Sequence, residues 1–294
     1  MSIKNIPVVI IHWGESAILD LAIAAAKAAG NFVILISDFT SPHLNAGADY
    51  CAHVNSFFES LSRFRDIYVH QSSLPLEFEY RCIVRWIILR DWMRSNGQSA
   101  VFHIDHDVLL FDRTENFPAI FSTADVGLSH RTCGHNSYIT FEFLDQFVNF
   151  VQRTYSEQSG YIWRKIQTHW EYHLHMQVPG GVTDMLLLEI FTSGYDGIRL
   201  VEMTQLFPDS PNFSFPSCKF STFDHNISVG DGYKTINLGG SFNVKQIAVH
   251  RENVPSGFLL KSSEYVRFLT LHFQGQSKAI AEDIVNFIKR GANR

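Results

Sequence analysis

Two aspartates at the end of a hydrophobic segment are the residues of this chain best suited to chemistry. Asp105 and Asp107 follow an apolar run at 100–104 that reads as a buried strand. A strand that stops at such a pair delivers two hard oxygen ligands to a solvent cleft, which suits Mg²⁺ or Mn²⁺ and a phosphate-bearing substrate. A single aspartate here would more often cap a helix or close a turn. The pair after a buried strand favours a metal site.

A second group of functional side chains lies far downstream, at three-residue intervals. His272 ends a predicted strand, Gly275 permits a close approach of the backbone, and Lys278 carries a charge that can contact phosphate oxygens. An imidazole added to carboxylates favours Mn²⁺ over Mg²⁺. We therefore expect Asp105, Asp107 and His272 to hold one cation.

The first 130 residues indicate the elements that position these side chains. Apolar β-branched runs predict buried parallel strands, and helical spacing of apolar residues predicts the helices between them. Strand–helix–strand order predicts a right-handed βαβ unit and a doubly wound sheet, with ligands at the carboxyl ends of the strands. The predicted strands are 7–11, 32–37, 100–104 and 126–129, and the predicted helices are 16–29 and 76–93, the second with its exit turn at Asn96 and Gly97.

Three further candidates lie at the ends of the first two predicted strands. His12 and Trp13 follow the first strand and Asp38 follows the second. Trp13 could stack on a base and Asp38 could accept a hydrogen bond from a ribose or a base. Aromatic side chains at strand ends often serve only as edge packing, which is the alternative for Trp13.

The second half of the chain changes character after its helices. Helices are predicted at 141–155, 161–175 and 184–191, followed by a proline-punctuated loop from Phe207 and a glycine-rich stretch at 230–240. Short strands at 245–250 and 267–272 and a helix at 278–290 complete the chain. We expect one large domain, with a donor-binding half at 1–126 and an acceptor half at 127–294.

Arg85 lies four residues after Arg81 on the helix before the Asp-x-Asp segment, so both share one helix face. Functionally these arginines could clamp a diphosphate, with Arg85, flanked by Val84 and Trp86, the better candidate. Alternatively they are solvated or pair with nearby glutamates.

Asp184 opens a predicted helix directly after Gly180 and Gly181. The plain interpretation is a capping carboxylate favoured by the helix dipole. Because the glycines would let this loop approach a ligand, Asp184 could instead bind an acceptor hydroxyl or act as its general base. A histidine-rich segment at 169–175 lacks the His-Glu-x-x-His order, which argues against zinc binding there.

The Asp-x-Asp pair together with His272, Gly275 and Lys278 resembles the metal and diphosphate motifs of GT-A-fold glycosyltransferases, in particular the glycogenin and bacterial lipooligosaccharide galactosyltransferase group. The resemblance implies a mixed, mostly parallel α/β sheet flanked by helices, with Mn²⁺ (or Mg²⁺) on the two aspartates and the histidine. It also implies a nucleotide-sugar donor such as a UDP-sugar, with Lys278 on its diphosphate. The acceptor would be a glycan or another hydroxyl compound, handled by residues that include 136–138, 180–184 and the loop after Phe207.

Two other functions compete with this interpretation. The segment around Asp105 also looks like the first motif of haloacid-dehalogenase-type phosphatases, with the 229–232 segment as their late acidic motif. Against this, about a hundred residues precede the motif here, and His272 and Lys278 would have no task. A non-catalytic nucleotide-sugar-binding protein is the third possibility.

Composition bounds the class of protein. The 294 residues are 46% hydrophobic and 18% charged, as in an ordinary folded domain, and the net charge of −5 argues against nucleic-acid binding. The four scattered cysteines form no Cys-x-x-Cys pair, which favours reduced thiols. No segment reads as a signal peptide or a membrane span. We expect a soluble cytoplasmic protein, and peripheral membrane contact stays open.

Overall fold

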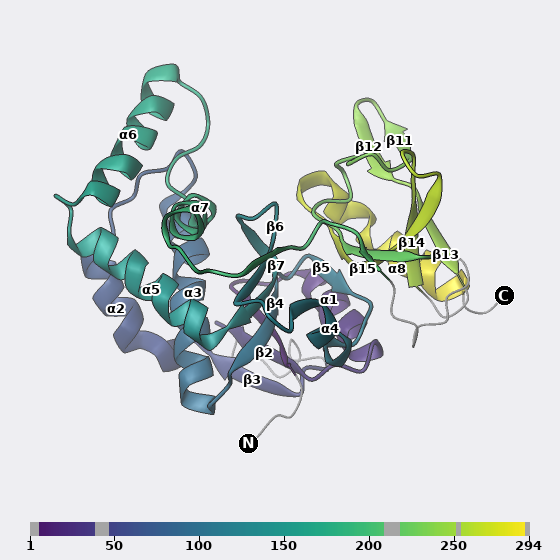
Figure 1. Ribbon diagram of the computed structural model, residues 1–294, viewed down its shortest axis with the longest axis horizontal. Helices are drawn as coiled ribbons and strands as arrows, with labels where there is room; N and C mark the ends of the chain where they lie inside the picture. The colour runs from purple at the N-terminus through teal and green to yellow at the C-terminus, as the bar shows by residue number, and fades with distance from the viewer. Residues whose placement is uncertain (1–5, 39–46, 209–217, 251–253, 292–294) are drawn as a thin grey trace.

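The computed structural model describes residues 6–38, 47–208, 218–250 and 254–291. Its centre is a seven-stranded sheet in the order β3-β2-β1-β4-β7-β6-β8 (Figure 1). β3, β2, β1 and β4 are parallel, β7 runs antiparallel to both of its neighbours, and β8 is parallel to β6. The strands are β1 (Val8–His12), β2 (Val33–Ser37), β3 (Tyr50–His53), β4 (Ala100–Ile104), β6 (Val126–Ser129), β7 (Cys133–Thr140) and β8 (Leu200–Glu202).

Each central strand is buried on both faces, which explains its uninterrupted apolar sequence. Successive side chains of a strand point to opposite faces. In β1, accordingly, Val9 and Ile11 join one hydrophobic cluster, whereas Val8 and Ile10 join a second. The sheet therefore separates two cores.

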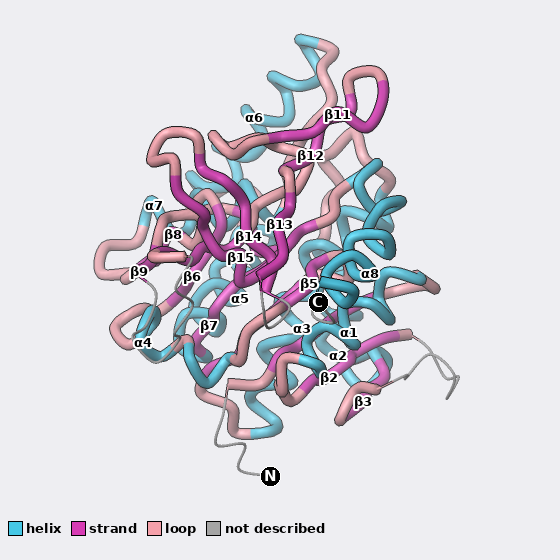
Figure 2. The backbone as a smooth tube through the Cα atoms, turned by 90° about the vertical axis from the view of Figure 1, so that its right-hand side faces the viewer, coloured by secondary structure: helices cyan, strands magenta, loops and turns pink. Residues whose placement is uncertain are grey.

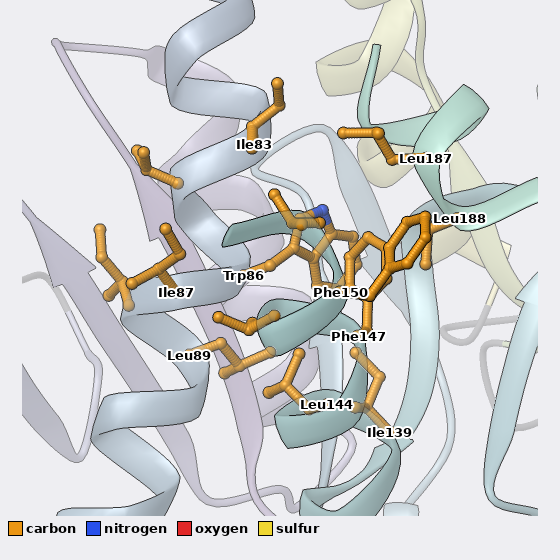
Figure 3. Packing of buried hydrophobic residues seen from close by; sticks show 14 of the residues in the cluster. Ile83, Trp86, Ile87, Leu89, Ile139, Leu144, Phe147, Phe150, Leu187 and Leu188 are labelled. Atoms are coloured by element: carbon orange, nitrogen blue, oxygen red, sulfur yellow. The ribbon is translucent and has the colours of Figure 1, made fainter. Parts of the chain in front are cut away.

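Helices cover the first face. Trp86, Phe147 and Leu188 come from three different helices and pack together in this core (Figure 3). Gly97 ends the long helix α3 in the left-handed conformation, with φ of 61°. The helices contributing to this core are α2 (Phe58–Ile67), α3 (Leu76–Asn96), α5 (Phe141–Ser156), α6 (Tyr161–Met176) and α7 (Asp184–Gly194).

The other face packs on α1 (Ala17–Ala28), α4 (Pro118–Phe121), a second sheet and α8 (Ala281–Gly291). The second sheet has the order β13-β14-β15-β10-β9, and β5 pairs with β15 in antiparallel fashion (Figure 2). The register sets Val108 of β5 opposite His272 of β15, so the start of β5 lies beside the end of β15. The remaining strands are β5 (Val108–Leu110), β9 (Phe207–Pro208), β10 (Phe220–Phe223), β11 (Thr235–Gly239), β12 (Phe242–Lys245), β13 (Ile247–His250), β14 (Val254–Leu259) and β15 (Glu264–His272), and the 3₁₀ helices are η1 (Val54–Phe57), η2 (Thr114–Asn116) and η3 (Gly275–Ile280).

The predicted fold class is confirmed: a mixed, mostly parallel sheet flanked by helices in a single domain. The strand predicted at 245–250 is divided, because β12 ends at Lys245 and β13 begins at Ile247. The helix predicted from 278 starts as the 3₁₀ helix η3 and becomes α-helical only at Ala281. Residues 209–217 of the predicted proline-rich loop lie outside the described residues, and the division into donor and acceptor halves stays a prediction.

Cys51, Cys82 and Cys133 are free thiols, as expected. Within the described segments, no helix combines the length and the apolar character needed to cross a membrane.

Candidate active site

The Asp-x-Asp segment forms the tight turn between β4 and β5. The backbone N–H of Val108 donates to the carbonyl oxygen of Asp105 at 3.1 Å, which closes the turn. The N–H of Asp105 donates to the carbonyl oxygen of His135 on β7 at 2.6 Å. Because the chain turns here, the directions of the Asp105 and Asp107 side chains are not set by the alternation of side chains along a strand.

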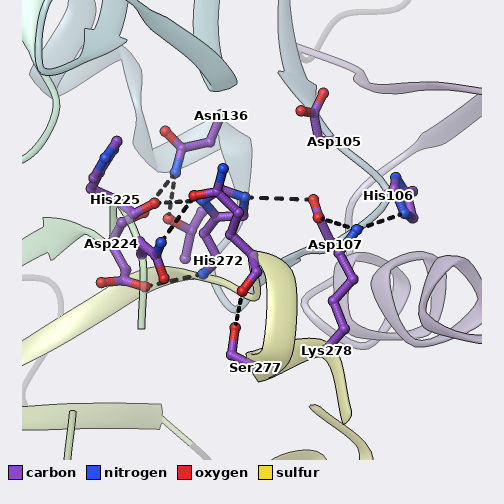
Figure 4. A network of polar contacts seen from close by, with 12 residues as sticks. Asp105, His106, Asp107, Asn136, Asp224, His225, His272, Ser277 and Lys278 are labelled. Atoms are coloured by element: carbon purple, nitrogen blue, oxygen red, sulfur yellow. Dashed lines mark hydrogen bonds and ion pairs between the residues drawn. The ribbon is translucent and has the colours of Figure 1, made fainter. Parts of the chain in front are cut away.

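Asp107 meets two residues from the end of the chain. Its carboxylate is 6% exposed, with Oδ2 2.8 Å from Lys278 Nζ and Oδ1 3.6 Å from His272 Nε2 (Figure 4). The N–H of Phe273 donates to the Asp107 carbonyl oxygen at 2.9 Å, which ties the turn to the end of β15. Asp107, His272 and Lys278 therefore lie together, and their role in binding a metal and a diphosphate stays a prediction.

Asp105 belongs to a different set of contacts. Arg85 Nη1 donates to its Oδ1 at 2.5 Å, and Arg85 Nη2 donates to Asp184 Oδ2 at 2.6 Å. Trp86 Nε1 donates to the same Asp184 oxygen at 3.1 Å. Burial alone would raise the pKa of the Asp105 carboxyl, but Arg85 and His103 hold that pKa well below its usual range. The Arg85 guanidinium thus bridges two carboxylates. Its partners are Asp105 and Asp184, and not Glu77 or Glu79, the alternative that the sequence left open.

The residue types fit a divalent ion, and two of the three expected ligands, Asp107 and His272, lie close together. Two ligands that each lie about 2.1 Å from one ion can be up to about 4.2 Å apart, so Asp107 and His272 are close enough to share it. Asp105 pairs with Arg85. Its carboxylate points away from Asp107 and His272 (Figure 4). Among the described residues, the three carboxylate and imidazole atoms do not gather within 4.8 Å of one another. Asp105 would join the ion through water or after leaving Arg85, and its role as a ligand stays a prediction.

A buried network fixes the orientation of His272. Its backbone N–H donates to Asp224 Oδ2 at 3.1 Å, and its Nδ1 faces the carbonyl oxygen of His225, which leaves Nε2 toward Asp107. Asn136, fully buried on β7, donates to the Asp224 carbonyl oxygen at 3.1 Å and to Thr270 Oγ1 at 3.0 Å. These supporting residues were not all predicted: only Asn136 was singled out, and the polar triplet after β10 was the signal that could have identified Asp224 and His225.

His12 joins the site from the end of β1. Its ring lies 4.1 Å from the ring of His106, measured between centroids, and His106 Nε2 is 3.4 Å from Lys278 Nζ. Burial and the neighbouring His106 lower the pKa of His12 to about 4. The His12 imidazole is therefore neutral at physiological pH, and burial lowers the pKa of the neighbouring His106 as well.

Trp13 and Asp38 lie where predicted, after β1 and β2. The N–H of Gly14 donates to Asp38 Oδ1 at 3.0 Å, so this carboxylate ties the two strand ends together. The Arg81 guanidinium lies 5.8 Å from the centre of the Trp13 ring, a cation–π contact. These contacts are compatible with edge packing and with a nucleoside site, and the nucleoside role stays a prediction.

The chain matches no protein-family model and no curated protein sequence. Among solved structures, it is similar to mouse xyloside xylosyltransferase 1 in its apo form, at 10% identity and a TM-score of 0.45, over 67% of this chain and 84% of that chain. It is also similar to two structures of glycosyltransferase GlyE from Streptococcus pneumoniae TIGR4, both at 12% identity and over 68% of this chain, with TM-scores of 0.36 and 0.33. The match spans 46% and 45% of those two chains.

Proposed function

We propose that this chain is a metal-dependent glycosyltransferase that transfers a sugar from a nucleoside diphosphate sugar, a UDP-sugar in the first instance, to a hydroxyl group of a glycan or another acceptor. The observation that carries the proposal is the convergence of Asp107, His272 and Lys278 from two distant segments. A carboxylate, an imidazole and an ammonium group at one strand end form a set suited to a divalent ion and a diphosphate.

In the proposed complex, Asp107 and His272 hold Mn²⁺, with Asp105 as the third protein ligand. The bound ion would act as a Lewis acid that neutralises charge on the departing diphosphate. Lys278 would exchange its contact with Asp107 for one with a phosphate oxygen, since its side chain is 40% exposed and has room to move. This cation would then stabilise the leaving group more in the transition state than in the ground state.

Arg85 and Asp184 are assigned to the sugar side of the site. Asp184 is 4% exposed at the start of α7, and its Oδ2 accepts from both Arg85 and Trp86. Because the Asp184 carboxylate is already held by Arg85 and Trp86, we assign Asp184 to binding a hydroxyl group. A general-base role would require that the contact with Arg85 be released.

The nucleoside end of the donor is assigned to His12, Trp13 and Asp38. His12 is the last residue of β1, Trp13 follows it, and Asp38 follows β2, at the edge where the parallel strand β4 also ends. In open α/β sheets, ligands bind outside the carboxyl ends of the strands. A base stacked on Trp13 would place its diphosphate toward the β4–β5 turn.

The phosphatase alternative is less well supported by the contacts. Its late acidic motif would need Asp231 beside Asp105, but Asp231 Oδ2 instead accepts from Lys245 Nζ at 2.8 Å. The strand before Asp105 is also the fourth in chain order and not the first.

Calorimetric titration with UDP, GDP and CDP, with and without Mn²⁺, tests the proposal. We expect binding of at least one nucleotide that depends on Mn²⁺ and that is lost in Asp107→Ala. The variant Asp196→Ala, which changes an exposed aspartate away from the site, serves as the control and should bind like the wild type. Nucleotide binding with the same affinity in the presence and absence of Mn²⁺, or unchanged binding in Asp107→Ala, would contradict the proposal. Binding without turnover of any UDP-sugar would favour the non-catalytic alternative.

A further inference from the structure

Beside the proposed transfer site lies a second group of possible metal ligands that the proposed function does not use. Cys133 and His135 are two residues apart on β7, so their side chains point to the same face of the strand. His225 approaches from the segment after β10. One ligand atom from each of the three residues lies within 4.8 Å of the other two.

Two of these side chains have buried nitrogen atoms with no hydrogen-bond partner. His135 is 7% exposed, and its Nε2 is buried and unpaired. His225 Nδ1 is likewise buried and unpaired. A buried polar atom without a partner destabilises the fold, because it has lost its hydrogen bonds to water and gained none in return. A cation coordinated by both imidazole nitrogens would give these atoms the partner that they lack.

The ligand types at this place differ from those of the Asp107 site. A thiol and two imidazoles are borderline-to-soft ligands that select Zn²⁺ over Mg²⁺ or Ca²⁺. The Met185 thioether adds a further soft atom, with its Sδ 3.4 Å from Cys133 Sγ. The set is therefore chemically distinct from the carboxylate-based site next to it.

Another group of possible metal ligands is equally compact, but its carboxylates already have hydrogen-bond partners. Glu79, Cys82 and Asp184 also bring ligand atoms within 4.8 Å. There, however, Glu79 Oε2 accepts from Ser72, and Asp184 Oδ2 accepts from Arg85 and Trp86. A cation at that place would displace existing hydrogen bonds and would lie next to a guanidinium.

We propose that Cys133, His135 and His225 bind Zn²⁺. The ion would take the Cys133 thiolate and the two imidazoles, with its fourth position open to water or to the Met185 thioether, as is usual for three-ligand zinc sites. Binding would release the thiol proton to solvent.

The site would support the neighbouring His272. The carbonyl oxygen of His225 faces His272 Nδ1, and the His135 and His272 rings are stacked with centroids 4.1 Å apart. A metal that fixes His225 and His135 would thereby fix the orientation of His272, as outer contacts of metal ligands commonly do. Zn²⁺ is assigned here to positioning, and the transfer chemistry stays with the Asp107 site.

Cobalt titration of the purified full chain tests the proposal, because Co²⁺ replaces Zn²⁺ and a cobalt–thiolate bond gives a near-ultraviolet charge-transfer absorption that oxygen and nitrogen ligands do not. We expect one equivalent of Co²⁺ to produce this band and Zn²⁺ to abolish it. Cys133→Ser should lose the band, and His225→Ala should weaken or lose it. Cys51→Ser, a matched change at an exposed cysteine, should retain it.

The result is separable from the proposed transferase function. Asp107→Ala should keep the cobalt–thiolate band while it loses Mn²⁺-dependent nucleotide binding. Absence of the band in the wild type, or its persistence in Cys133→Ser, overturns the zinc proposal. Circular dichroism of each variant separates loss of the site from loss of the fold, and a folded His225→Ala protein with an unchanged Co²⁺ titration also overturns it.

Discussion

Arg85 is the residue on which the arrangement of the carboxylates depends. Its side chain is 12% exposed and contacts Asp105 and Asp184, which come from a turn and a helix far apart in the sequence. Two carboxylates in such a place repel each other unless a cation lies between them. Arg85 presents two N–H groups in a fixed fork, and a lysine cannot reproduce that geometry.

We predict that Arg85→Ala destabilises the chain by about 3–5 kcal/mol, because it leaves the buried Asp184 carboxylate and the partly buried Asp105 carboxylate without their cation. Arg85→Lys should recover part of the stability and little of the transferase activity. Urea unfolding monitored by fluorescence measures the first effect, and a sugar-transfer assay measures the second. Arg81→Ala, one helical turn earlier and exposed, is the matched control and should change stability far less. Wild-type stability in Arg85→Ala would contradict the bridging role.

Lys278 provides a second prediction at this scale, because its ammonium group and the proposed ion share one carboxylate. Lys278 Nζ lies 2.8 Å from Asp107 Oδ2, so in the absence of a nucleotide it opposes the arrival of a second cation. We expect Lys278→Gln to bind free Mn²⁺ more tightly than the wild type and the Mn²⁺–UDP complex less tightly. Manganese titration with and without UDP measures both affinities, with Lys165→Gln as a surface control. Weaker binding in both titrations would show that Lys278 does not compete with the metal.

The sequence identifies some of these residues and not others, for a physical reason. Asp107, His272 and Lys278 were predicted because each stands in a local motif at a strand end. Cys133 and His225 belong to no recognisable sequence motif. They come together only because β7 and β10 pair with their neighbouring strands. The direction of the Asp105 carboxylate depends on Arg85, and a motif contains no information about such a distant partner.

At the scale of elements, the loop before α7 holds Asp184 in place through a close backbone approach. Gly181 forms a bridge with Ser72, and the N–H of Val182 donates to the Gln71 carbonyl oxygen at 2.7 Å. A Cβ on Gly181 would lie 2.4 Å from that carbonyl oxygen, and its φ of 143° is unfavourable for any other residue. The glycine is therefore required by both space and backbone conformation.

We predict that Gly181→Ala lowers stability by about 1–3 kcal/mol through backbone strain and steric overlap, and that it reduces transfer activity because α7 and Asp184 shift. Gly194→Ala is the matched control at the other end of the same helix, where an added Cβ meets nothing within 4 Å. This control should be neutral or slightly stabilising. Thermal unfolding of both variants tests the contrast, and equal effects would contradict it.

The edge of the central sheet offers a pH-dependent prediction. Asp125, just before β6, accepts hydrogen bonds from the side chain and the N–H of Arg199, just before β8, and the Arg199 side chain lowers the pKa of this carboxyl. A carboxyl with a lowered pKa in the folded state stabilises the protein above its unfolded pKa, about 3.9, and that contribution is lost as the pH falls through the folded pKa. Asp125→Asn should therefore destabilise the chain at pH 6, and the difference from the wild type should shrink on acidification below pH 4. Urea unfolding at several pH values measures this difference, and one that grows toward low pH would refute the linkage.

Helices and strands could be predicted from sequence where their apolar residues followed a clear pattern. The helices α1, α3, α5, α6 and α7 and the strands β4 and β6 were predicted to within a few residues. The helices showed apolar residues at helical spacing, and the strands were short apolar runs because they are buried on both faces. The elements β3, α2 and β5 were not predicted: β3 is largely exposed and has no apolar alternation, and β5 has only three residues. Their structure depends on tertiary pairing, β3 with β2 and β5 with β15.

At the scale of the whole molecule, the proposed site joins the two sheets. Asp107 precedes β5, which pairs with β15 of the second sheet, whereas β4 before it belongs to the central sheet. Both sheets also share one hydrophobic core, in which Phe102 of β4 contacts Phe223 of β10 at a centroid distance of 5.7 Å. Separation of the sheets would expose this core and take the site apart.

We therefore predict that the chain unfolds in a single calorimetric transition. UDP together with Mn²⁺ should raise the midpoint temperature of that transition. A ligand present at about 100 times its Kd adds about 2.7 kcal/mol, which for a chain of this size corresponds to a shift of roughly 5 °C. The shift should vanish in Asp107→Ala, whose transition should stay single because the shared core is intact. Two separate transitions, with only one responding to the ligand, would show that the sheets are independent units. An equal shift in Asp107→Ala would instead place the nucleotide and its metal away from the β4–β5 turn.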